Sequence, residues 1–221
     1  MRRASAVMDF TLGERQQAVA SLAAEVLGAA DPWKELARAG LLDVSPPDGL
    51  GVLEVAVLLT EIGKRAPSMQ ALATLMTGAL PLLRWGQPDL LAGVASGELL
   101  LTAALREPPA APATAVTDGT ITGLKVGVPY ANQSRLLLIP ARLALPDSMI
   151  VNSSGQIAPQ TVHDHGVALV RPDAEGVRVT RTPSSSGEPE YAVQLDHAPV
   201  EGMLGGADCV RNLYQLAVAG A

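Results

Sequence analysis

The sequence predicts an α+β protein, with a helical domain over residues 8–97, an antiparallel β-barrel or sandwich over 98–207 and a further helix over 208–221. Two changes of pattern support this prediction. Up to residue 97, apolar residues recur at helical spacing between helix-capping residues. From residue 99, short runs rich in Val, Leu and Thr alternate with turn dipeptides.

The first two helices have recognisable ends. Thr11 and Glu14 form a capping-box pattern, and apolar residues follow it at helical spacing. Asp31 followed by Pro32 predicts the next start, since aspartate caps a helix and proline is tolerated in its first turn. Gly40 predicts the end of that helix by adopting a left-handed conformation.

Three further helices are expected before the β-rich part. Residues 53–64 are apolar on most sides except at Glu54 and Glu61, which indicates a buried helix. Residues 69–84 form another, with a break expected in its second half, where a glycine and a proline occur. Residues 88–95 form a short one.

The β-rich part is divided by turn signals into eight predicted strands. The strands are LLLTAAL, ATAVT, TITGLKVGV, SRLLLIPA, SMIVNS, GVALVRP, GVRVTRT and EYAVQLD. The turn signals are Asp118-Gly119, Ser154-Gly155, Glu175-Gly176 and Ser186-Gly187.

The final segment, 208–221, is predicted to be a helix capped by Asp208. One face of this helix is apolar, and we expect that face to need a partner, either another chain or residues beyond this sequence. The residues on that face are Val210, Leu213, Leu216 and Ala217.

Composition narrows the class of protein. The chain has 221 residues, 48% of them hydrophobic, which is enough for a substantial core. A net charge of −6 and an aromatic content of 3% argue against nucleic-acid binding. The single cysteine, Cys209, excludes an internal disulfide and favours a reducing, cytoplasmic location. No apolar run is long enough for a membrane span.

Few residues suggest chemistry of their own. His163, Asp164 and His165 offer metal-ligating groups, but zinc requires three or four ligands and His197 is the only other histidine. A polar turn between strands is the favoured interpretation. Cys209, near a helix start, is either a reactive thiol or a small buried residue, and burial is favoured.

Two carboxylates lie in apolar surroundings. Glu61 and Glu107 could each have a raised pKa and act as a base. Alternatively, each pairs with a neighbouring arginine or caps backbone groups, which we favour. No G-x-S-x-G, Walker A or G-x-G-x-x-G motif occurs, so the sequence contains no motif that would indicate a serine hydrolase or a phosphate-binding loop.

The order of several weak motifs resembles the acyl-CoA dehydrogenase family. In order they are MDFTLGERQQAV, PWKELARAGLLDVSPPDGLG, LEVAVLLTEIGKRA, GELLLTAALREP, ITGLKVGVPYANQSRLLLIPA and APVEGMLGG. The resemblance implies a helical N-terminal domain, a β-barrel middle domain and the start of a C-terminal helical bundle that is largely absent from this sequence. LKVGVPYA and VRVTRTPSSSGEPEYAVQLDHAPV are most similar to smaller subunits of actinobacterial heteromeric dehydrogenases that act on steroid side-chain CoA thioesters.

The resemblance also implies a chemistry. In the family, FAD accepts a hydride from the acyl-CoA β-carbon while a glutamate removes the α-proton. The flavin edge usually reads A-L-T-E-P-x-A-G-S-D. Here Arg106 replaces the threonine, and Pro112 falls near the serine that reaches the pyrophosphate. Ala103 and Leu105 could still offer backbone groups to a flavin, so Ala103, Leu105 and Arg106 form a degenerate flavin edge.

The next strand departs from the family as well. Tryptophan and threonine usually follow the lysine of a G-x-K motif and lie beside the ring. Here Gly127 and Pro129 stand in those places after Lys125. We therefore expect this strand, too, to contribute little to flavin binding.

These departures predict a non-catalytic subunit without a catalytic residue of its own and inactive by itself. A flavin-binding dehydrogenase subunit would hold most of the FAD and the acyl-CoA, in a heterotetramer, with no nucleic acid or membrane as a partner. Two alternatives remain open: an ordinary homomeric dehydrogenase without its C-terminal domain, and a scaffolding protein that kept the fold alone.

Overall fold

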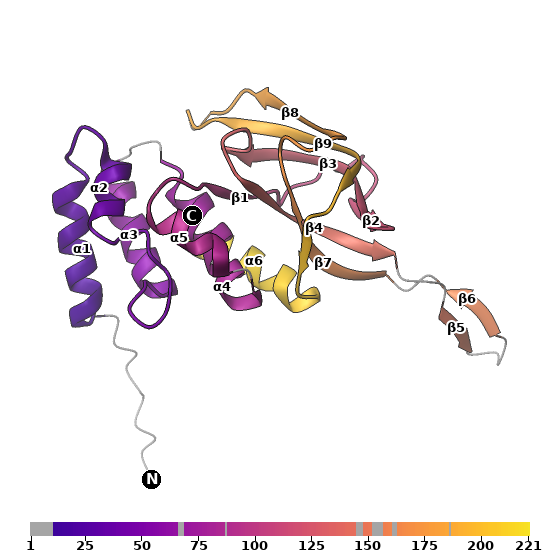
Figure 1. Ribbon diagram of the computed structural model, residues 1–221, viewed down its shortest axis with the longest axis horizontal. Coiled ribbons are helices and arrows are strands. Elements are labelled where there is room, and N and C mark those ends of the chain that lie inside the picture. Colours follow the sequence, from indigo (N-terminus) through magenta and orange to yellow (C-terminus); the bar gives the residue numbers. More distant parts are fainter. Residues whose placement is uncertain are drawn as a thin grey trace, which may run out of the picture.

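A computed structural model describes residues 11–65, 69–86, 88–144, 148–151, 157–160, 163–185 and 187–221. Helices gather on one side of the molecule and strands on the other (Figure 1), and the last helix runs back beside the helical part. Residues 8–10, at the predicted start of the helical domain, lie outside the described residues, as do the Ser154-Gly155 turn and Ser186. The predicted domain boundaries stay a prediction.

The helical side follows the predicted order. It comprises α1 (Glu14–Val26), α2 (Pro32–Arg38), α3 (Val52–Arg65), the π-helix η1 (Leu72–Ala79), α4 (Leu80–Trp85), the 3-10 turn η2 (Pro88–Leu90) and α5 (Leu91–Ala95). The Thr11 cap is wrong by two residues. Gly13 precedes α1, and its backbone N–H donates to Gln16 Oε1 at 2.7 Å, which replaces the predicted capping pair.

The predicted ends of α2 are confirmed. The Asp31 carboxylate accepts the backbone N–H of Lys34 at 3.3 Å, and Gly40 has a φ of 72°. Helix α3 is not buried all round: Leu53 is 67% exposed, while Val55, Leu58 and Ile62 are buried. A helix on the outside of the molecule buries only one stripe, whatever the hydrophobicity of the other faces.

The break expected within 69–84 is not a break but a change of helix type. The Leu80 N–H donates to the Leu75 carbonyl, the wide spacing of a π-helix, and α4 continues from there with Pro81 in its first turn. Gly78 lies against β1 so closely that an added Cβ would be 2.5 Å from Leu101 Cβ. The missing side chain therefore lets the first strand dock on the π-helix.

The strands form one eight-stranded sheet, within the described residues, in the order β10-β7-β4-β2-β3-β9-β8, with β1 also paired to β4. A separate hairpin joins β5 and β6. The eight predicted strands are all present, and β6 and β10 were not predicted. The strands are β1 (Leu101–Ala103), β2 (Ala115–Thr117), β3 (Thr120–Pro129), β4 (Leu136–Ala144), β5 (Ser148–Val151), β6 (Ile157–Gln160), β7 (His163–Val170), β8 (Val177–Thr182), β9 (Glu190–Pro199) and β10 (Gly202–Leu204).

The sheet departs from a purely antiparallel arrangement at β4. Both β1 and β2 run parallel to β4, beside its first and second halves. The chain reverses between β2 and β3, at the Asp118-Gly119 turn, and reverses again between β3 and β4. As a result, β2 and β4 run in the same direction. β1 and β2 therefore lie one after the other along the same edge of β4, and the segment 104–114 connects them.

Alternation along the strands separates two cores. One face of β4 and β7 packs with the helices, through residues such as Leu136, Leu138 and Leu169. The other face meets β3 and β9 in a second core that includes Leu137, Ile139 and Val193. Because side chains alternate between faces, consecutive residues of β4 contribute to different cores.

The final helix, α6 (Ala207–Gly220), does not need a second chain to cover its buried face. Cys209, Leu213 and Leu216 pack into the helical core of the same chain, against η1, α3, α4 and β7. Gly206 precedes the helix, and Asp208 pairs with Arg211 rather than capping it. Within the described residues, no helix is both long and apolar enough to cross a membrane.

Candidate functional site

The predicted flavin edge lies where β1 leaves the sheet, and its backbone groups are already bonded within the chain. The Leu105 carbonyl accepts the Tyr214 hydroxyl at 2.7 Å, and the Arg106 carbonyl accepts the Val126 N–H at 2.9 Å. Ala103 is buried in β1 and paired along β4. The carbonyls of Leu105 and Arg106 are thus committed to the protein itself.

Arg106 covers the neighbouring strand. Its guanidinium Nη2 lies 3.4 Å from the Gly127 carbonyl oxygen and 3.5 Å from Glu190 Oε2. Gly127 has a φ of 58°, and a Cβ there would overlap the Arg106 guanidinium. The Arg106 guanidinium therefore fills the space that a side chain at position 127 would otherwise occupy.

A cavity of about 480 Å³ lies beside Arg106, between η1, α6 and the edge of the sheet. Its wall is mostly apolar, with Glu188 and Glu190 on one side. The residues that line it are Met69, Leu72, Ala73, Thr77, Ala103, Leu105, Arg106, Gly127, Pro129, Tyr130, Glu188, Glu190, Ala217 and Ala221. All three predicted edge residues, together with Gly127 and Pro129, thus line one cavity.

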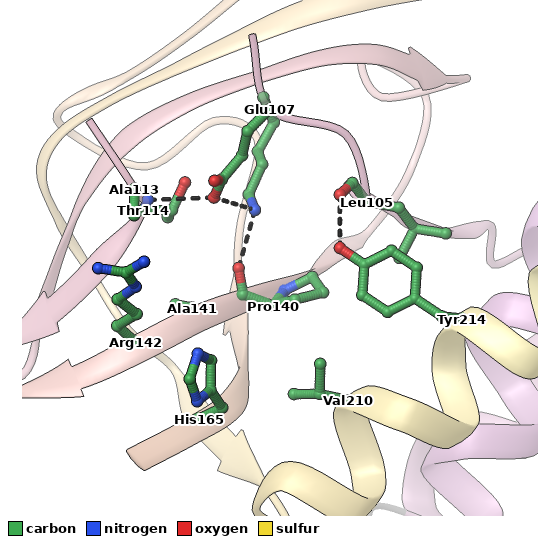
Figure 2. A pocket seen from close by; sticks show the side chains of 11 residues that line it. Leu105, Glu107, Ala113, Thr114, Pro140, Ala141, Arg142, His165, Val210 and Tyr214 are labelled. Atoms are coloured by element: carbon green, nitrogen blue, oxygen red, sulfur yellow. Dashed lines mark hydrogen bonds and ion pairs between the residues drawn. The ribbon is translucent and has the colours of Figure 1, made fainter. Parts of the chain in front are cut away.

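Glu107 is held by a buried lysine. Lys125, 1% exposed, donates from Nζ to Glu107 Oε1 at 2.7 Å and to the Pro140 carbonyl at 2.8 Å (Figure 2). Burial alone would raise the pKa of Glu107, but the hydrogen bonds from Lys125 and Thr114 outweigh it and lower the pKa. Glu107 is an ionised partner of Lys125, so its interpretation as a base is wrong.

Burial has the opposite effect on the lysine. It lowers the pKa of Lys125, and the hydrogen bond and the charge of Glu107 oppose that shift only in part. The pair fixes the segment 104–114 to β3 and β4 from inside. The role supported by these contacts is structural.

Glu61 also has the structural role that we favoured. Lys64 Nζ lies 2.5 Å from Glu61 Oε1, and Arg65 Nη1 lies 3.2 Å from Oε2. The hydrogen bond from Lys64, followed by that from Arg65, lowers the pKa of Glu61 below its usual value despite burial. A base with a raised pKa is excluded at this position.

The structure describes Cys209 as a buried thiol and the segment from His163 to His165 as part of a strand. Burial raises the pKa of the Cys209 thiol to about 11, which leaves little thiolate at neutral pH. His163, Asp164 and His165 lie on β7 rather than in a turn, because the strand begins earlier than its apolar residues suggest. In the described part of the chain, no three His, Cys, Asp or Glu residues gather as metal ligands.

Sequence reasoning missed two features of this region. Tyr214 reaches Leu105 across 109 positions of sequence, for which no local pattern gives a signal. Arg142 and His165 face each other on β4 and β7 and line a second pocket, of about 290 Å³ (Figure 2). The β propensity of both strands was visible, but the register that pairs these residues was not.

Comparison with known proteins identifies relatives of similar organisation. FadE28, an acyl-CoA dehydrogenase of Mycobacterium tuberculosis, is 39% identical over 215 residues, which cover 91% of this chain and 55% of FadE28. The ChsE4-ChsE5 complex from the same organism matches with a TM-score of 0.78 and 25% identity, over 95% of this chain and 62% of the matched chain. No protein-family model matches the sequence.

A further solved structure is similar to this chain over nearly its whole length. The Tcur3481-Tcur3483 steroid ACAD, solved as a G363A variant, matches with a TM-score of 0.74 and 27% identity, over 94% of this chain and 61% of the matched one. The helices, the eight-stranded sheet and the returning helix define an acyl-CoA dehydrogenase-like fold. The chain is a homologue of FadE28, and it spans about half the length of that protein.

Proposed function

We propose that this chain is the non-catalytic subunit of a heteromeric FAD-dependent acyl-CoA dehydrogenase. The observation that carries this proposal is the position of Arg106, whose guanidinium lies over Gly127 at the edge where the family holds the flavin ring. The guanidinium fills the space over Gly127, so an aromatic ring could lie on this surface only if Arg106 moved away. The carbonyls of Leu105 and Arg106, which bond within the chain, offer a flavin nothing further.

The substitutions around Arg106 support the same conclusion. Pro112 and Pro129 have no N–H to donate, and neither offers a hydroxyl in place of the serine and the threonine that the family uses. These residues do not fit an isoalloxazine ring. The flavin ring and the glutamate that removes the α-proton would therefore be held by a partner subunit with an intact edge.

The partner and the substrate are proposed from the relatives. One matched structure is a complex of two different proteins, ChsE4 and ChsE5, and another is described as a steroid ACAD. We infer a heterotetramer in the cytoplasm that dehydrogenates a CoA thioester of a steroid side chain between its α and β carbons. This chain would contribute the apolar cavity wall and the subunit contacts, but no catalytic group.

One observation favours a second candidate, a homomeric dehydrogenase. The cavity of about 480 Å³ beside Arg106 persists although the flavin edge is degenerate. If Arg106 swings out, as its 66% exposed side chain permits, the same surface becomes open to a ligand. This alternative predicts flavin in the chain purified without any partner.

An absorption spectrum separates the two candidates. The full chain is purified alone and after co-expression with a flavin-binding dehydrogenase subunit, and the visible flavin bands are compared. We expect flavin in the complex only, and dehydrogenation of a steroid CoA thioester by the complex only. Flavin bands in the chain alone would overturn the proposal.

Two variants make the test specific to the edge. Arg106→Thr restores the residue type of the family, while Arg178→Thr changes an exposed arginine on β8 and serves as the control. In the complex, neither variant should change the turnover number by more than about twofold, because no interaction of the transition state is removed. A large loss of turnover in the Arg106 variant alone would place this chain in the catalytic machinery.

A further inference from the structure

The dipeptide Asp-Gly occurs twice in the sequence, and the structure places the two copies in different surroundings. An aspartate that precedes a glycine can react with its own backbone, because the glycine nitrogen has no neighbouring side chain to hinder its attack on the aspartate carboxyl carbon. Asp118-Gly119 joins β2 to β3, and Asp48-Gly49 lies in the loop before α3. Both aspartates are exposed, so access to solvent does not distinguish them.

Asp118 and Gly119 form the whole loop of a two-residue hairpin. Thr117 and Thr120 pair directly on either side of the loop, and φ is 49° at Asp118 and 77° at Gly119. Two positive φ angles are typical of a type I′ turn. This left-handed conformation suits the glycine but is unfavourable for the aspartate, which has a side chain. Asp118 is therefore held in it by the pairing of the two strands.

The peptide group between Asp118 and Gly119 is not fixed by hydrogen bonds. In the part of the chain that the structure describes, neither the Asp118 carbonyl nor the Gly119 N–H has a hydrogen-bond partner. A Cβ at Gly119 would have no heavy atom within 4 Å apart from its chain neighbours. A bond from the Val200 N–H to the Gly119 carbonyl, at 3.1 Å, holds the following peptide group instead. The Asp118 side chain thus has room to rotate towards the Gly119 nitrogen.

Asp48-Gly49 has the opposite environment. The Gly49 N–H donates to the Ser45 carbonyl at 2.7 Å, and a Cβ at Gly49 would lie 2.3 Å from the Ser45 nitrogen. Arg15 Nη2 donates to the carbonyl of Asp48 at 2.7 Å and to that of Gly49 at 2.6 Å. The nitrogen that would react is bonded, and the peptide groups on both sides of Gly49 are held. The structure therefore protects this copy.

We propose that Asp118-Gly119 is a modification site, at which Asp118 converts to isoaspartate in the folded protein while Asp48-Gly49 stays intact. The Gly119 nitrogen loses its proton and bonds to Asp118 Cγ, while the Cγ–OH bond breaks and water leaves, which closes a cyclic succinimide. One water molecule then opens the ring. Attack at Cγ restores aspartate, whereas attack at the main-chain carbonyl carbon leaves isoaspartate, with the chain running through Cβ and Cγ. Water is the only co-reactant.

The extra backbone atom of isoaspartate falls where several strands meet. β2 pairs with β3 through the turn and with β4 on its other side, and Val200, just after β9, bonds to the Gly119 carbonyl. A two-residue hairpin loop sets the register of the strands that it joins. The modified chain should therefore have a lower melting temperature. Its isoaspartyl carboxylate, at an exposed loop tip, is the group that a protein isoaspartyl methyltransferase accepts.

Incubation of the full chain in water enriched in heavy oxygen tests the proposal, because each opening of the ring adds one solvent oxygen to the residue. A folded sample and a sample unfolded in guanidinium chloride are kept in mildly acidic buffer, since water leaves most readily from the neutral carboxyl group. Incubation continues until the unfolded chain is labelled at both sites. Peptide mass spectrometry locates the label and the isoaspartate.

In the folded chain we expect heavy oxygen and isoaspartate at Asp118, and about tenfold less or lower at Asp48, because the Gly49 N–H must first leave its hydrogen bond. In the unfolded chain the two sites should react at similar rates. Absence of label at Asp118 in the folded chain would overturn the proposal, as would equal labelling of Asp118 and Asp48 there.

Asp118→Glu and Asp48→Glu are the matched variants, since the longer side chain disfavours closure of the ring and keeps the charge. Asp118→Glu should abolish methyl transfer from S-adenosylmethionine to the aged, folded protein by an isoaspartyl methyltransferase, while Asp48→Glu should leave it unchanged. An equal effect of the two variants would contradict the proposal. Circular dichroism checks that each sample is folded. The flavin test of Arg106 measures a different property, so the two proposals fail independently.

Discussion

The Arg106 guanidinium lies against the backbone of Gly127, with Nη2 3.4 Å from the glycine carbonyl oxygen. The two residues are 21 positions apart in sequence and meet because Val126 pairs with Arg106 across the edge of the sheet. Gly127 makes the approach possible in two ways: its φ of 58° is accessible to glycine, and it has no side chain to displace the arginine. This contact holds the Arg106 side chain against β3 at the end of the predicted flavin edge.

Gly127→Ala is expected to destabilise the protein more than a glycine replacement that has only the backbone cost. The left-handed conformation costs alanine about 1–2 kcal/mol. The overlap is with the far end of the exposed Arg106 side chain, which can move aside, so it adds at most about 1 kcal/mol through the loss of the contacts of Arg106 with the Gly127 carbonyl and Glu190. Gly119→Ala is the matched control, because Gly119 has a φ of 77° and open space around its Cβ position. Urea unfolding of both variants measures the difference.

The double variant Arg106→Ala/Gly127→Ala isolates the overlap. Without the guanidinium, the excess cost of Gly127→Ala over Gly119→Ala should largely disappear. If the excess persists in the double variant, Arg106 is not the neighbour that Gly127 accommodates.

Lys125→Met is expected to destabilise the protein by about 1–2 kcal/mol, because the buried Pro140 carbonyl loses its donor and Glu107, whose side chain is 32% exposed, loses its ionic partner. The double variant Glu107→Gln/Lys125→Met should recover the part of this loss that comes from the unpaired charge of Glu107. Chemical denaturation of the single and double variants measures the coupling. Additive losses in the double variant would show that the pair is not an energetic unit.

The contribution of Glu107 to stability should depend on pH in a defined direction. Its pKa is lower in the folded state than the ordinary value of 4.5, so ionised Glu107 stabilises the fold above pH 4.5 and loses that effect as the pH falls through the folded pKa. Wild-type protein and Glu107→Gln are unfolded in urea between neutral pH and about pH 3. The difference between them should shrink on acidification, and a constant difference would contradict the ion pair.

Cys209 should react slowly with thiol reagents in the folded protein. Its pKa is raised to about 11 by burial, so near pH 8 the thiolate is a small fraction of the total, and the sulfur is shielded as well. Labelling with a disulfide reagent is followed with and without denaturant. The rate should rise steeply on unfolding, whereas rapid labelling of the native chain would show that the start of α6 opens.

Tyr214→Phe tests the attachment of α6 to the edge. The hydroxyl donates to the Leu105 carbonyl at 2.7 Å, and its loss should cost about 1 kcal/mol. Tyr191→Phe is the matched control, since Tyr191 is buried in the other core. Thermal unfolding should show a larger drop for the Tyr214 variant. Equal drops would mean that the Leu105 contact adds nothing to stability.

Much of the fold could be predicted from local patterns. Asp31, Gly40 and the Asp118-Gly119 turn act through backbone geometry within a few residues, so their roles are visible in sequence. The Thr11 cap failed because Gln16 satisfies the Gly13 N–H instead, a choice between two nearby groups that the pattern does not decide. The π-helix of 72–79 was not predicted, since the glycine and the proline in this segment were expected to break the helix.

In the candidate site, too, some features could be predicted from the sequence and others could not. Resemblance placed Ala103, Leu105 and Arg106 at the flavin edge, and the cavity of about 480 Å³ includes all three. The partners of these residues could not be predicted: Gly127 meets Arg106 through a β-bridge, and Tyr214 reaches Leu105 from α6. Glu107 was expected to pair with an arginine or to cap backbone groups. It accepts the backbone N–H of Thr114, as expected, but its ionic partner is the buried Lys125 of β3 rather than an arginine.

By itself, then, the sequence determined the order of the helices and of most strands, the presence of Arg106 and Pro129 where the resemblance predicts threonines, and the resemblance to acyl-CoA dehydrogenases. These properties depend on short-range patterns and on the identity of single residues, both of which can be read directly from the sequence. Only the tertiary structure decided that Arg106 lies over Gly127, that Lys125 neutralises Glu107, and that Arg142 faces His165. Such pairings depend on strand register and on burial, which arise when distant segments pack together.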